Sequence, residues 1–237
     1  MRINSLVDAA ELEKEQAVLS PEESHHLARV LRVQPGQEIV LFDGQGGVAD
    51  AIVESVSKTC VEARISRRWN VPKPPVEIDL IQAVPKPDRW ELVLQKAVEL
   101  GATTIHPILT RHTEYKPNHA KEERWKKIVL NAAQQCEVRW VPVLNPLAAL
   151  DVVLPSLEPY DLILVGSLYE GARPLREVDL KGKKRIALLI GPEGDFAKDE
   201  VDAAVNAGAV PVSFGERILR TETAAIFGLS VLAYELL

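Results

Sequence analysis

Two patterns of apolar and polar positions divide the chain near residue 70. In the first part, the mostly apolar stretches 39–42 and 48–56 flank Asp43-Gly44-Gln45-Gly46-Gly47, which predicts a β-hairpin. Residues 58–65 alternate apolar and polar positions, as a half-buried strand does. Ser20-Pro21-Glu22-Glu23 predicts a helix start, with Ser20 as N-cap and Glu23 completing a capping box. Short strands with one small helix predict a compact β-barrel over residues 1–70.

Beyond a proline-rich linker at residues 71–76, strands and helices alternate. Apolar stretches predict strands at 76–84, 103–108, 160–165, 186–190 and 210–214. Helices are predicted after Asp88, which acts as N-cap with Glu91 at the third position, along the apolar stripe 125–136, and at 198–207 and 221–237. This alternation predicts an α/β domain over residues 77–237, with a mostly parallel sheet covered on both faces.

Composition and charge narrow the class of protein only a little. The formal net charge of −6 argues weakly against a nucleic-acid partner, but RNA binding needs only a local basic surface. The sequence shows no apolar stretch of membrane-spanning length and no signal peptide at its start. Cys60 and Cys136 are too few for a disulfide scaffold, and the five histidines never stand at zinc spacing. We expect a cytoplasmic protein without a metal or a membrane partner.

The candidate chemistry lies in two glycine-containing segments, Gly191–Gly194 and Gly215–Ala224, each directly after a predicted strand. Glycine at a strand end permits positive φ and close approach of a ligand to the main chain. Ligands of open α/β sheets bind beyond the carboxyl ends of the strands, so the two segments predict one cofactor pocket. Thr221 is the expected N-cap of the following helix. Arg217 and Arg220 oppose the dipole of that helix, which favours a functional role for Arg220.

Two weaker motifs allow simpler interpretations. Gly44 to Ala49 matches the dinucleotide fingerprint G-x-G-x-x-A, but a strand rather than a helix is predicted after it, so we interpret it as the hairpin turn. Arg29 and Arg32 are either solvated surface residues or, beside Arg64 and Arg67, part of a basic face for RNA phosphates.

The pairing of Ile190–Gly194 with Arg217–Ala224 resembles the RsmE family of the SPOUT superfamily. These enzymes use S-adenosylmethionine (SAM) to methylate ring nitrogen N3 of a uridine in small-subunit ribosomal RNA. His25–Arg32, Leu41–Gly44, Gln95–Gly101 and Gln135-Cys136 are similar to the family as well, so the resemblance covers nearly the whole chain. It implies a PUA-like RNA-binding barrel, a SPOUT domain with a C-terminal trefoil knot, and a homodimer with the cofactor near the subunit interface.

The resemblance also implies the residues of the site. The cofactor-binding residues would be Leu164, Gly166, Ile190, Gly191, Glu193, Gly194, Gly215, Ile218, Leu219, Thr221, Thr223 and Ala224, and the RNA-binding residues Arg29, Arg32, Arg64 and Arg67. Arginine stays protonated and is a poor base, so Arg220 is expected to steady negative charge on the uracil carbonyls. Glu222 is the nearest candidate to accept the N3 proton. The partner would be small-subunit ribosomal RNA or the small subunit itself.

The chain departs from the family pattern at four places. Asp195 stands where a second glycine is usual. Ala197 replaces a helix-capping serine, which predicts loss of a capping box with Glu200 and leaves Asp195 as a substitute acceptor. Glu137-Val138 replaces glycine and arginine, although Arg139 follows, and Glu216 replaces a common proline.

Two other functions remain open. One is an RNA-binding protein without catalysis, in which the altered segment 134–138 reflects lost turnover. The other is a nucleotide-dependent oxidoreductase, which is disfavoured because the sequence contains neither an early dinucleotide fingerprint nor a phosphate-binding P-loop motif.

Overall fold

The computed structural model describes residues 2–115, 117, 119–169 and 171–237. The chain divides into two compact units, Met1–Lys73 with Ala133–Val141, and Pro74–Ala132 with Pro142–Leu237. The break after Lys73 falls inside the predicted linker 71–76. Ala133–Val141 belongs to the first unit, although it lies within the predicted range 77–237. This segment is anchored there because Arg139 Nη1 donates to Asn4 Oδ1 at 2.9 Å and Trp140 Nε1 to the Val71 carbonyl at 3.0 Å.

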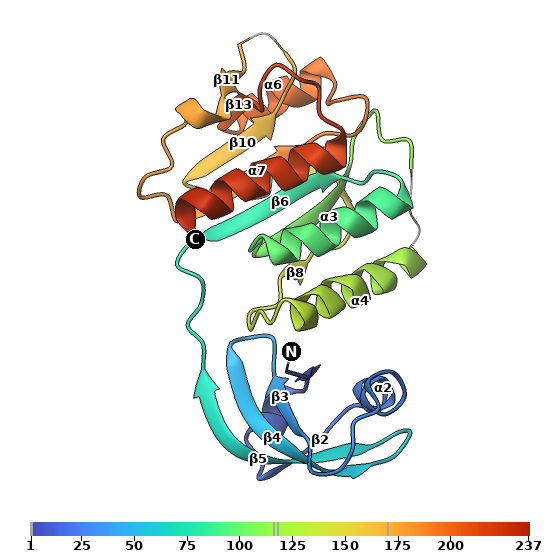
Figure 1. Ribbon diagram of the computed structural model, residues 1–237. Coiled ribbons are helices and arrows are strands. Elements are labelled where there is room, and N and C mark those ends of the chain that lie inside the picture. The colour runs from blue at the N-terminus through green and yellow to red at the C-terminus, as the bar shows by residue number, and fades with distance from the viewer. Residues whose placement is uncertain (1, 116, 118, 170) are drawn as a thin grey trace. The chain divides into compact units, whose positions relative to one another are not determined.

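The first unit is a curled five-stranded sheet in the order β1-β3-β4-β5-β2 (Figure 1). Its elements are β1 (Asn4–Leu6), α1 (Ala9–Leu12), β2 (Gln16–Val18), α2 (Pro21–His25), a π-helical segment (His26–Leu31), β3 (Glu38–Phe42), β4 (Gly47–Val56) and β5 (Val61–Asn70). Antiparallel pairing of β3 with β4 confirms the predicted hairpin, and Gly44 and Gly46 turn it with φ of 75° and 96°. The G-x-G-x-x-A match is therefore turn and strand.

At the start of α2, the predicted N-cap is confirmed and the predicted capping box is not. Ser20 is the N-cap, and its Oγ accepts a hydrogen bond from the Glu23 N–H at 3.2 Å. The Glu23 carboxylate, however, does not complete a capping box. It is buried and accepts hydrogen bonds from Ser5 Oγ and from Gln134 Nε2 instead. A buried carboxylate requires several donors, and these two side chains supply them.

The second unit contains the predicted α/β alternation. Its elements are β6 (Glu77–Ala83), α3 (Pro87–Glu99), β7 (Thr104–Leu109), α4 (His119–Gln135), β8 (Val143–Leu144), β9 (Ala148–Ala149), α5 (Leu150–Val153), β10 (Leu162–Gly166), β11 (Arg173–Pro174), β12 (Arg185–Ile190), α6 (Lys198–Asn206), β13 (Ala209–Ser213) and α7 (Thr221–Leu236). Three of the strands, β8, β9 and β11, are two residues long and were not predicted, because so short a stretch carries no periodicity.

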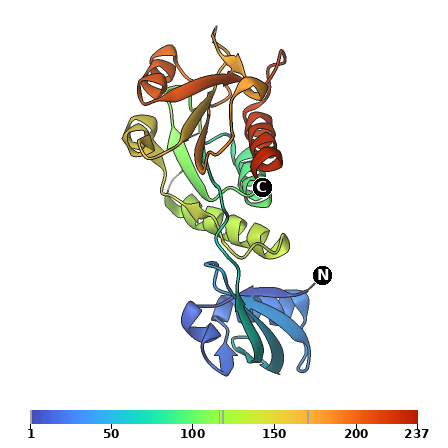
Figure 2. The same cartoon turned by 90° about the vertical axis from the view of Figure 1, so that its left-hand side faces the viewer.

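The strands of this unit lie in the order β11-β13-β10-β12-β6-β7-β8, with β9 beside β7, and every pairing among them is parallel. Helices α3 and α7 lie on one face and α5 and α6 on the other (Figures 1 and 2). Alternate residues of β12 pack against the helices on opposite faces of the sheet. Ala187 and Leu189 pack into the core with α6, whereas Leu188 faces α7 at Gly228. The predicted α/β class is confirmed, and the trefoil knot stays a prediction.

The helix starts differ from the predictions. Lys86, not Asp88, is the N-cap of α3, because Pro87 occupies the first helical position. Ala197 caps α6 without a side-chain oxygen, yet Glu200 Oε2 accepts from the Ala197 N–H at 2.8 Å, so half of the capping box survives. Arg220 is the N-cap of α7, and Thr221 is its first helical residue. Within the described residues, no helix is long and apolar enough to cross a membrane.

Candidate cofactor site

Three loops meet beyond the carboxyl ends of the neighbouring parallel strands β13, β10 and β12. They follow Ser213, Gly166 and Ile190, and they surround a cavity of about 260 Å³. The cavity is lined by Gly166, Ser167, Leu168, Ile190, Gly191, Pro192, Glu193, Asp195, Val212, Ser213, Phe214, Gly215, Arg217, Ile218, Leu219, Arg220, Thr221 and Ala224. Apolar side chains with a few convergent polar groups are typical of a small-molecule site.

Thr221 joins the two glycine-containing loops. Its buried hydroxyl donates to the Gly191 carbonyl at 2.6 Å and accepts from Gln82 Nε2 at 2.7 Å. Gln82, at the end of β6, is fully buried, and the same Nε2 also donates to the Ala83 carbonyl. The predicted closeness of the two loops is confirmed. Thr221 takes part in this joint rather than in the capping that its position predicted.

The glycines of the two loops differ in backbone conformation and in the space around them. Gly215 has φ of 115° and a Cβ there would meet open space, so the prediction of positive φ is confirmed at this position. Gly191 and Gly194 do not have positive φ, so the prediction is wrong for both. A Cβ on Gly191 would lie 3.0 Å from the Phe196 nitrogen. The reversal in this loop occurs at Asp195, with φ of 59°.

Arg89 on α3 lies between a carboxylate of the loop after β12 and one in the first turn of α7. Its Nη1 is 3.5 Å from Glu193 Oε1, and its Nε is 3.7 Å from Glu222 Oε1. Glu222 is only 8% exposed, and its Oε2 has no hydrogen-bond partner among the described residues. One guanidinium therefore screens two acidic groups that would otherwise repel each other.

Arg220 differs from Arg89 in having no ion-pair partner among the described residues. Its side chain is exposed and lines the cavity, as does that of Arg217. A guanidinium without a carboxylate partner at a cavity wall is available to a ligand that carries negative charge or carbonyl oxygens. No cluster of side chains suited to a metal ion lies in the described part of the chain.

Four of the predicted cofactor-binding and catalytic residues lie outside the cavity lining: Leu164, Gly194, Glu222 and Thr223. Leu164 is buried within β10, and Thr223 is exposed on α7. Gly194 faces His112, whose Cβ would lie 3.3 Å from an added Cβ. The other predicted cofactor residues, together with Arg220, line the cavity.

Comparison with known proteins identifies the family. Residues 72–233 match the family model of the RNA methyltransferase domain, and residues 19–66 match the RNA methyltransferase PUA domain. Ribosomal RNA small subunit methyltransferase E of Mycobacterium tuberculosis is 33% identical over 225 residues, 90% of this chain and 84% of the relative. The protein of the same name from Synechocystis is 36% identical over 220 residues, 90% and 71% of the two chains. The chain belongs to the RsmE family.

Solved structures agree with this assignment. A methyltransferase from Legionella pneumophila, solved with bound SAM, has a TM-score of 0.92 at 33% identity and covers 99% of this chain and 98% of its own. Ribosomal RNA small subunit methyltransferase E from Neisseria gonorrhoeae, bound to SAM, has a TM-score of 0.91 at 30% identity, with the same coverage. The PUA-like unit and the SPOUT-type unit are therefore both present.

Two departures from the RsmE pattern fall on the same kind of backbone position. Asp195 and Glu137 both replace a usual glycine, and both have positive φ, 59° and 61°. Asp195 does not cap α6 as predicted. Its Oδ1 accepts from the Phe196 N–H at 2.8 Å and its Oδ2 from the Leu168 N–H at 3.2 Å. Both residues thus adopt the left-handed conformation that glycine reaches without strain.

The predicted RNA-binding residues lie in the first unit in two settings. Arg29 belongs to the π-helical segment and Arg32 ends it with φ of 54°, and neither has an ion-pair partner among the described residues. Arg64 and Arg67 lie on β5. Arg64 Nε is 3.1 Å from Glu54, and the Arg67 guanidinium stacks 5.5 Å from the Trp69 ring centre. These contacts do not join Arg29 and Arg32 to Arg64 and Arg67.

Sequence reasoning missed Gln82 and Arg89, as well as Ser167, Leu168 and Asp195 as wall residues. Ser167 and Leu168 directly follow a predicted strand, so the strand-end argument applied to that strand would have found them. Gln82 and Arg89 act across 139 and 104 residues of sequence, and no local pattern indicates such partners.

Proposed function

We propose that the protein transfers the methyl group of SAM to N3 of a uridine in small-subunit ribosomal RNA, in the cytoplasm. The observation that carries the proposal is the Thr221–Gly191 joint, which closes two loops around a cavity in a chain that shares its fold with SAM-bound relatives. Its apolar lining suits an adenine ring, and Gly215 presents bare main chain to the open space. The predicted lining residues would hold the cofactor there.

Bound SAM supplies a methyl group on a positively charged sulfur. The chain then has to place an unpaired or flipped base in line with that methyl group. Uridine N3 carries a proton that must leave, and negative charge develops on the two neighbouring carbonyls. Arg220 is positioned to stabilise this charge, because it lines the cavity without a carboxylate partner among the described residues.

Glu222 is a weaker candidate for the proton acceptor in the structure than in the sequence. As the proton acceptor it would have to reach the base, but it lies outside the cavity lining with Oε1 directed to Arg89. We assign it to holding Arg89 and the first turn of α7 in place. Glu222→Gln is therefore expected to keep a pH profile of kcat like that of the wild type, and loss of the acidic limb, where kcat falls as pH decreases, would restore the acceptor role.

The test of the reaction combines calorimetry with SAM and methylation of undermodified small ribosomal subunits. The wild type should bind SAM and modify one uridine, located by mass mapping of the RNA. Arg220→Ala should lower kcat by about 10²- to 10³-fold with SAM affinity unchanged, while Lys198→Ala on the surface should change neither. Failure of the wild type to bind SAM would favour an RNA-binding protein without catalysis.

RNA contact by the first unit is the second part of the proposal. Arg29 and Arg32 are exposed without ion-pair partners among the described residues, which suits phosphate binding. Arg64 and Arg67 would contribute less, because Glu54 and an aromatic ring already engage them. Arg29→Gln and Arg32→Gln should each reduce the salt slope of RNA affinity by about one, and Arg64→Gln by less. Equal slopes in all three variants would contradict this ranking.

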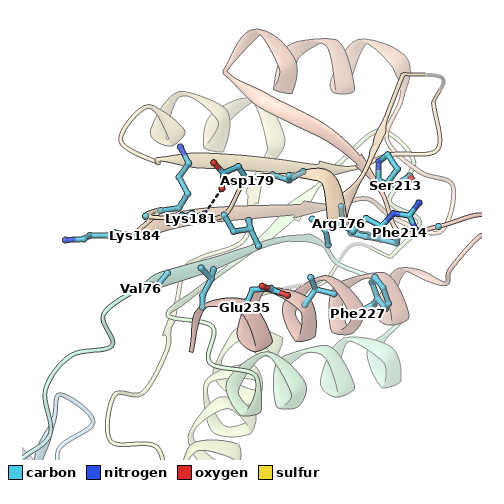
Figure 3. Close-up of a pocket in the computed structure, with 18 of the residues that line it drawn as sticks. Val76, Arg176, Asp179, Lys181, Lys184, Ser213, Phe214, Phe227 and Glu235 are labelled. Atoms are coloured by element: carbon cyan, nitrogen blue, oxygen red, sulfur yellow. Dashed lines mark hydrogen bonds between the residues drawn. The ribbon is translucent and has the colours of Figure 1, made fainter.

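We also propose a homodimer formed through the outer face of α7. The apolar residues of this helix are not confined to one stripe, and Phe227, Tyr234 and Leu237 at its outer face and end are 42%, 86% and 60% exposed. Above it lies a larger cavity of about 1400 Å³ (Figure 3). Figure 3 shows Phe227 and Glu235 rising from α7 towards the segment that carries Arg176. A second copy covering this face would bury apolar surface that is otherwise exposed to water.

The cofactor cavity borders this face, because Ser213, Phe214 and Gly215 line both cavities. Light scattering coupled to gel filtration should show a dimer for the wild type. Tyr234→Asp should shift it to a monomer, whereas Val143→Asp, at an exposed apolar residue on β8, should not. A monomeric wild type would refute the proposed interface.

A further inference from the structure

Asp195 connects two walls of the cofactor cavity. Its carboxylate accepts the N–H of Phe196, in its own loop, and the N–H of Leu168, in the loop after β10. Both Asp195 and Leu168 line the cavity. The Leu168 N–H bond, 3.2 Å long, therefore joins the two loops through a charged acceptor, a class of hydrogen bond that is in general stronger than one between neutral groups.

A second contact joins the same two loops. Tyr169 follows Leu168, and its hydroxyl donates to the Phe196 carbonyl at 3.1 Å. The loop after β10 is also anchored from below, because the Ser167 N–H donates to the Val212 carbonyl at 3.0 Å. Leu168 remains 62% exposed beyond this anchor. The Leu168 N–H and the Tyr169 hydroxyl therefore both bind this part of the loop to the loop of Asp195.

Aspartate at position 195, where the family pattern has glycine, adds a carboxylate to this wall of the cavity. Asp195 has φ of 59°, a conformation that glycine adopts without strain. The family's glycine would permit the same turn but would provide no acceptor for the Leu168 N–H. The carboxylate has no ion-pair partner among the described residues, so its two backbone contacts are the ones that orient it.

We propose that Asp195 is a positioning residue that clasps the loop after β10 to the loop after β12 and thereby slows the exchange of SAM. The inference rests on the proposed function, since it needs SAM in the cavity. Asp195 acts through Leu168 and has no part in methyl transfer itself. It is a feature of this chain, because the usual glycine cannot make the clasp.

The test compares Asp195→Gly and Asp195→Asn with the wild type. Glycine fits the backbone and removes both acceptors, whereas the asparagine amide can accept only one of the two N–H groups. Stopped-flow displacement of SAM should show dissociation about tenfold faster for Asp195→Gly and an intermediate rate for Asp195→Asn. The KM for SAM should rise in the same order, and kcat should not fall. Tyr169→Phe, which removes the second contact, should show a smaller increase.

Asp199→Asn is the matched control, since Asp199 pairs with Arg111 at the surface outside the cavity. It should leave SAM dissociation unchanged. Hydrogen exchange of the ligand-free proteins gives a readout independent of SAM. The Leu168 amide should exchange faster in Asp195→Gly than in the wild type or the control. The thermal midpoint of Asp195→Gly should stay near that of the wild type, because relief of positive φ offsets the lost contacts.

The outcomes separate this inference from the proposed function. A wild type that binds no SAM overturns both. A wild type that binds SAM normally, with Asp195→Gly releasing it at the same rate, overturns the clasp alone. Parallel losses of thermal midpoint and SAM affinity in Asp195→Gly would assign the residue a purely structural role and would also overturn the clasp.

Discussion

Replacement of Thr221 by valine removes the hydroxyl that joins the two cofactor loops and keeps nearly the same side-chain shape. The hydroxyl makes two hydrogen bonds, to the Gly191 carbonyl at 2.6 Å and from Gln82 Nε2 at 2.7 Å. Thr221 is 4% exposed and Gln82 is fully buried, so water cannot take the place of the lost partner without disturbing the core. The Gly191 carbonyl loses its side-chain donor, whereas Gln82 keeps a bond to Ala83.

The magnitude follows from these contacts. Each buried hydrogen bond contributes about 1 kcal/mol net, and a buried group left without a partner costs about 1–3 kcal/mol. Thr221→Val should therefore lower the free energy of unfolding of the second unit by roughly 2–4 kcal/mol. Since the same bond holds Gly191 at the cavity, SAM affinity should fall as well. Urea unfolding and calorimetry with SAM measure the two effects.

Thr221→Ser is the control, because it keeps the hydroxyl and loses one methyl group. Removal of a buried methyl costs about 1 kcal/mol, and SAM affinity should stay close to that of the wild type. A Thr221→Val protein as stable as Thr221→Ser, with the same SAM affinity, would refute the conclusion that this hydroxyl joins the loops.

Three further substitutions test other parts of the chain. Burial lowers the pKa of His106 below its ordinary value of 6.5. The neutral imidazole therefore contributes fully to the free energy of unfolding above that pH, and this contribution is lost as pH falls below it. His106→Gln should abolish this loss, measured by urea unfolding between about pH 7.5 and pH 5.5. Glu137→Gly should raise the free energy of unfolding by about 1 kcal/mol by relieving φ of 61°, while Glu137→Ala should give no gain. Gly46→Ala should cost about 2 kcal/mol or more, since its Cβ would lie 2.6 Å from the Val71 carbonyl; Gly36→Ala, with φ of 89° and open space around it, should cost about half as much.

Local periodicity predicted the long elements of the second unit well. The stretch 186–190 is β12, observed as Arg185–Ile190, and the last helix, predicted at 221–237, is observed as Thr221–Leu236 with Arg220 rather than Thr221 as its N-cap. The caps were harder because they depend on partners outside the local sequence. Thr221 has the side chain of an N-cap, but its hydroxyl forms its bonds with Gly191 and Gln82. A tertiary hydrogen bond therefore overrode a local preference.

The candidate site was predicted where its signal was local. Glycines at two strand ends indicated two of the three loops. Arg89 could not be found in this way, because it lies on a helix and meets Glu193 and Glu222 only after the chain has folded. The same contact altered the hypothesis for Glu222, whose place in the sequence beside Arg220 had indicated a share in the chemistry.

The departures from the RsmE pattern bear on whether the chain has lost catalysis, and the structure separates two of them. Glu137 and Asp195 share the left-handed backbone that glycine usually provides. At Glu137 the side chain forms a distant ion pair, 4.0 Å from Arg139, and the residue belongs to the first unit. At Asp195 the carboxylate joins two walls of the cavity. The first departure adds backbone strain in the first unit, and the second adds contacts between two walls of the cavity, so neither supports the hypothesis of lost turnover.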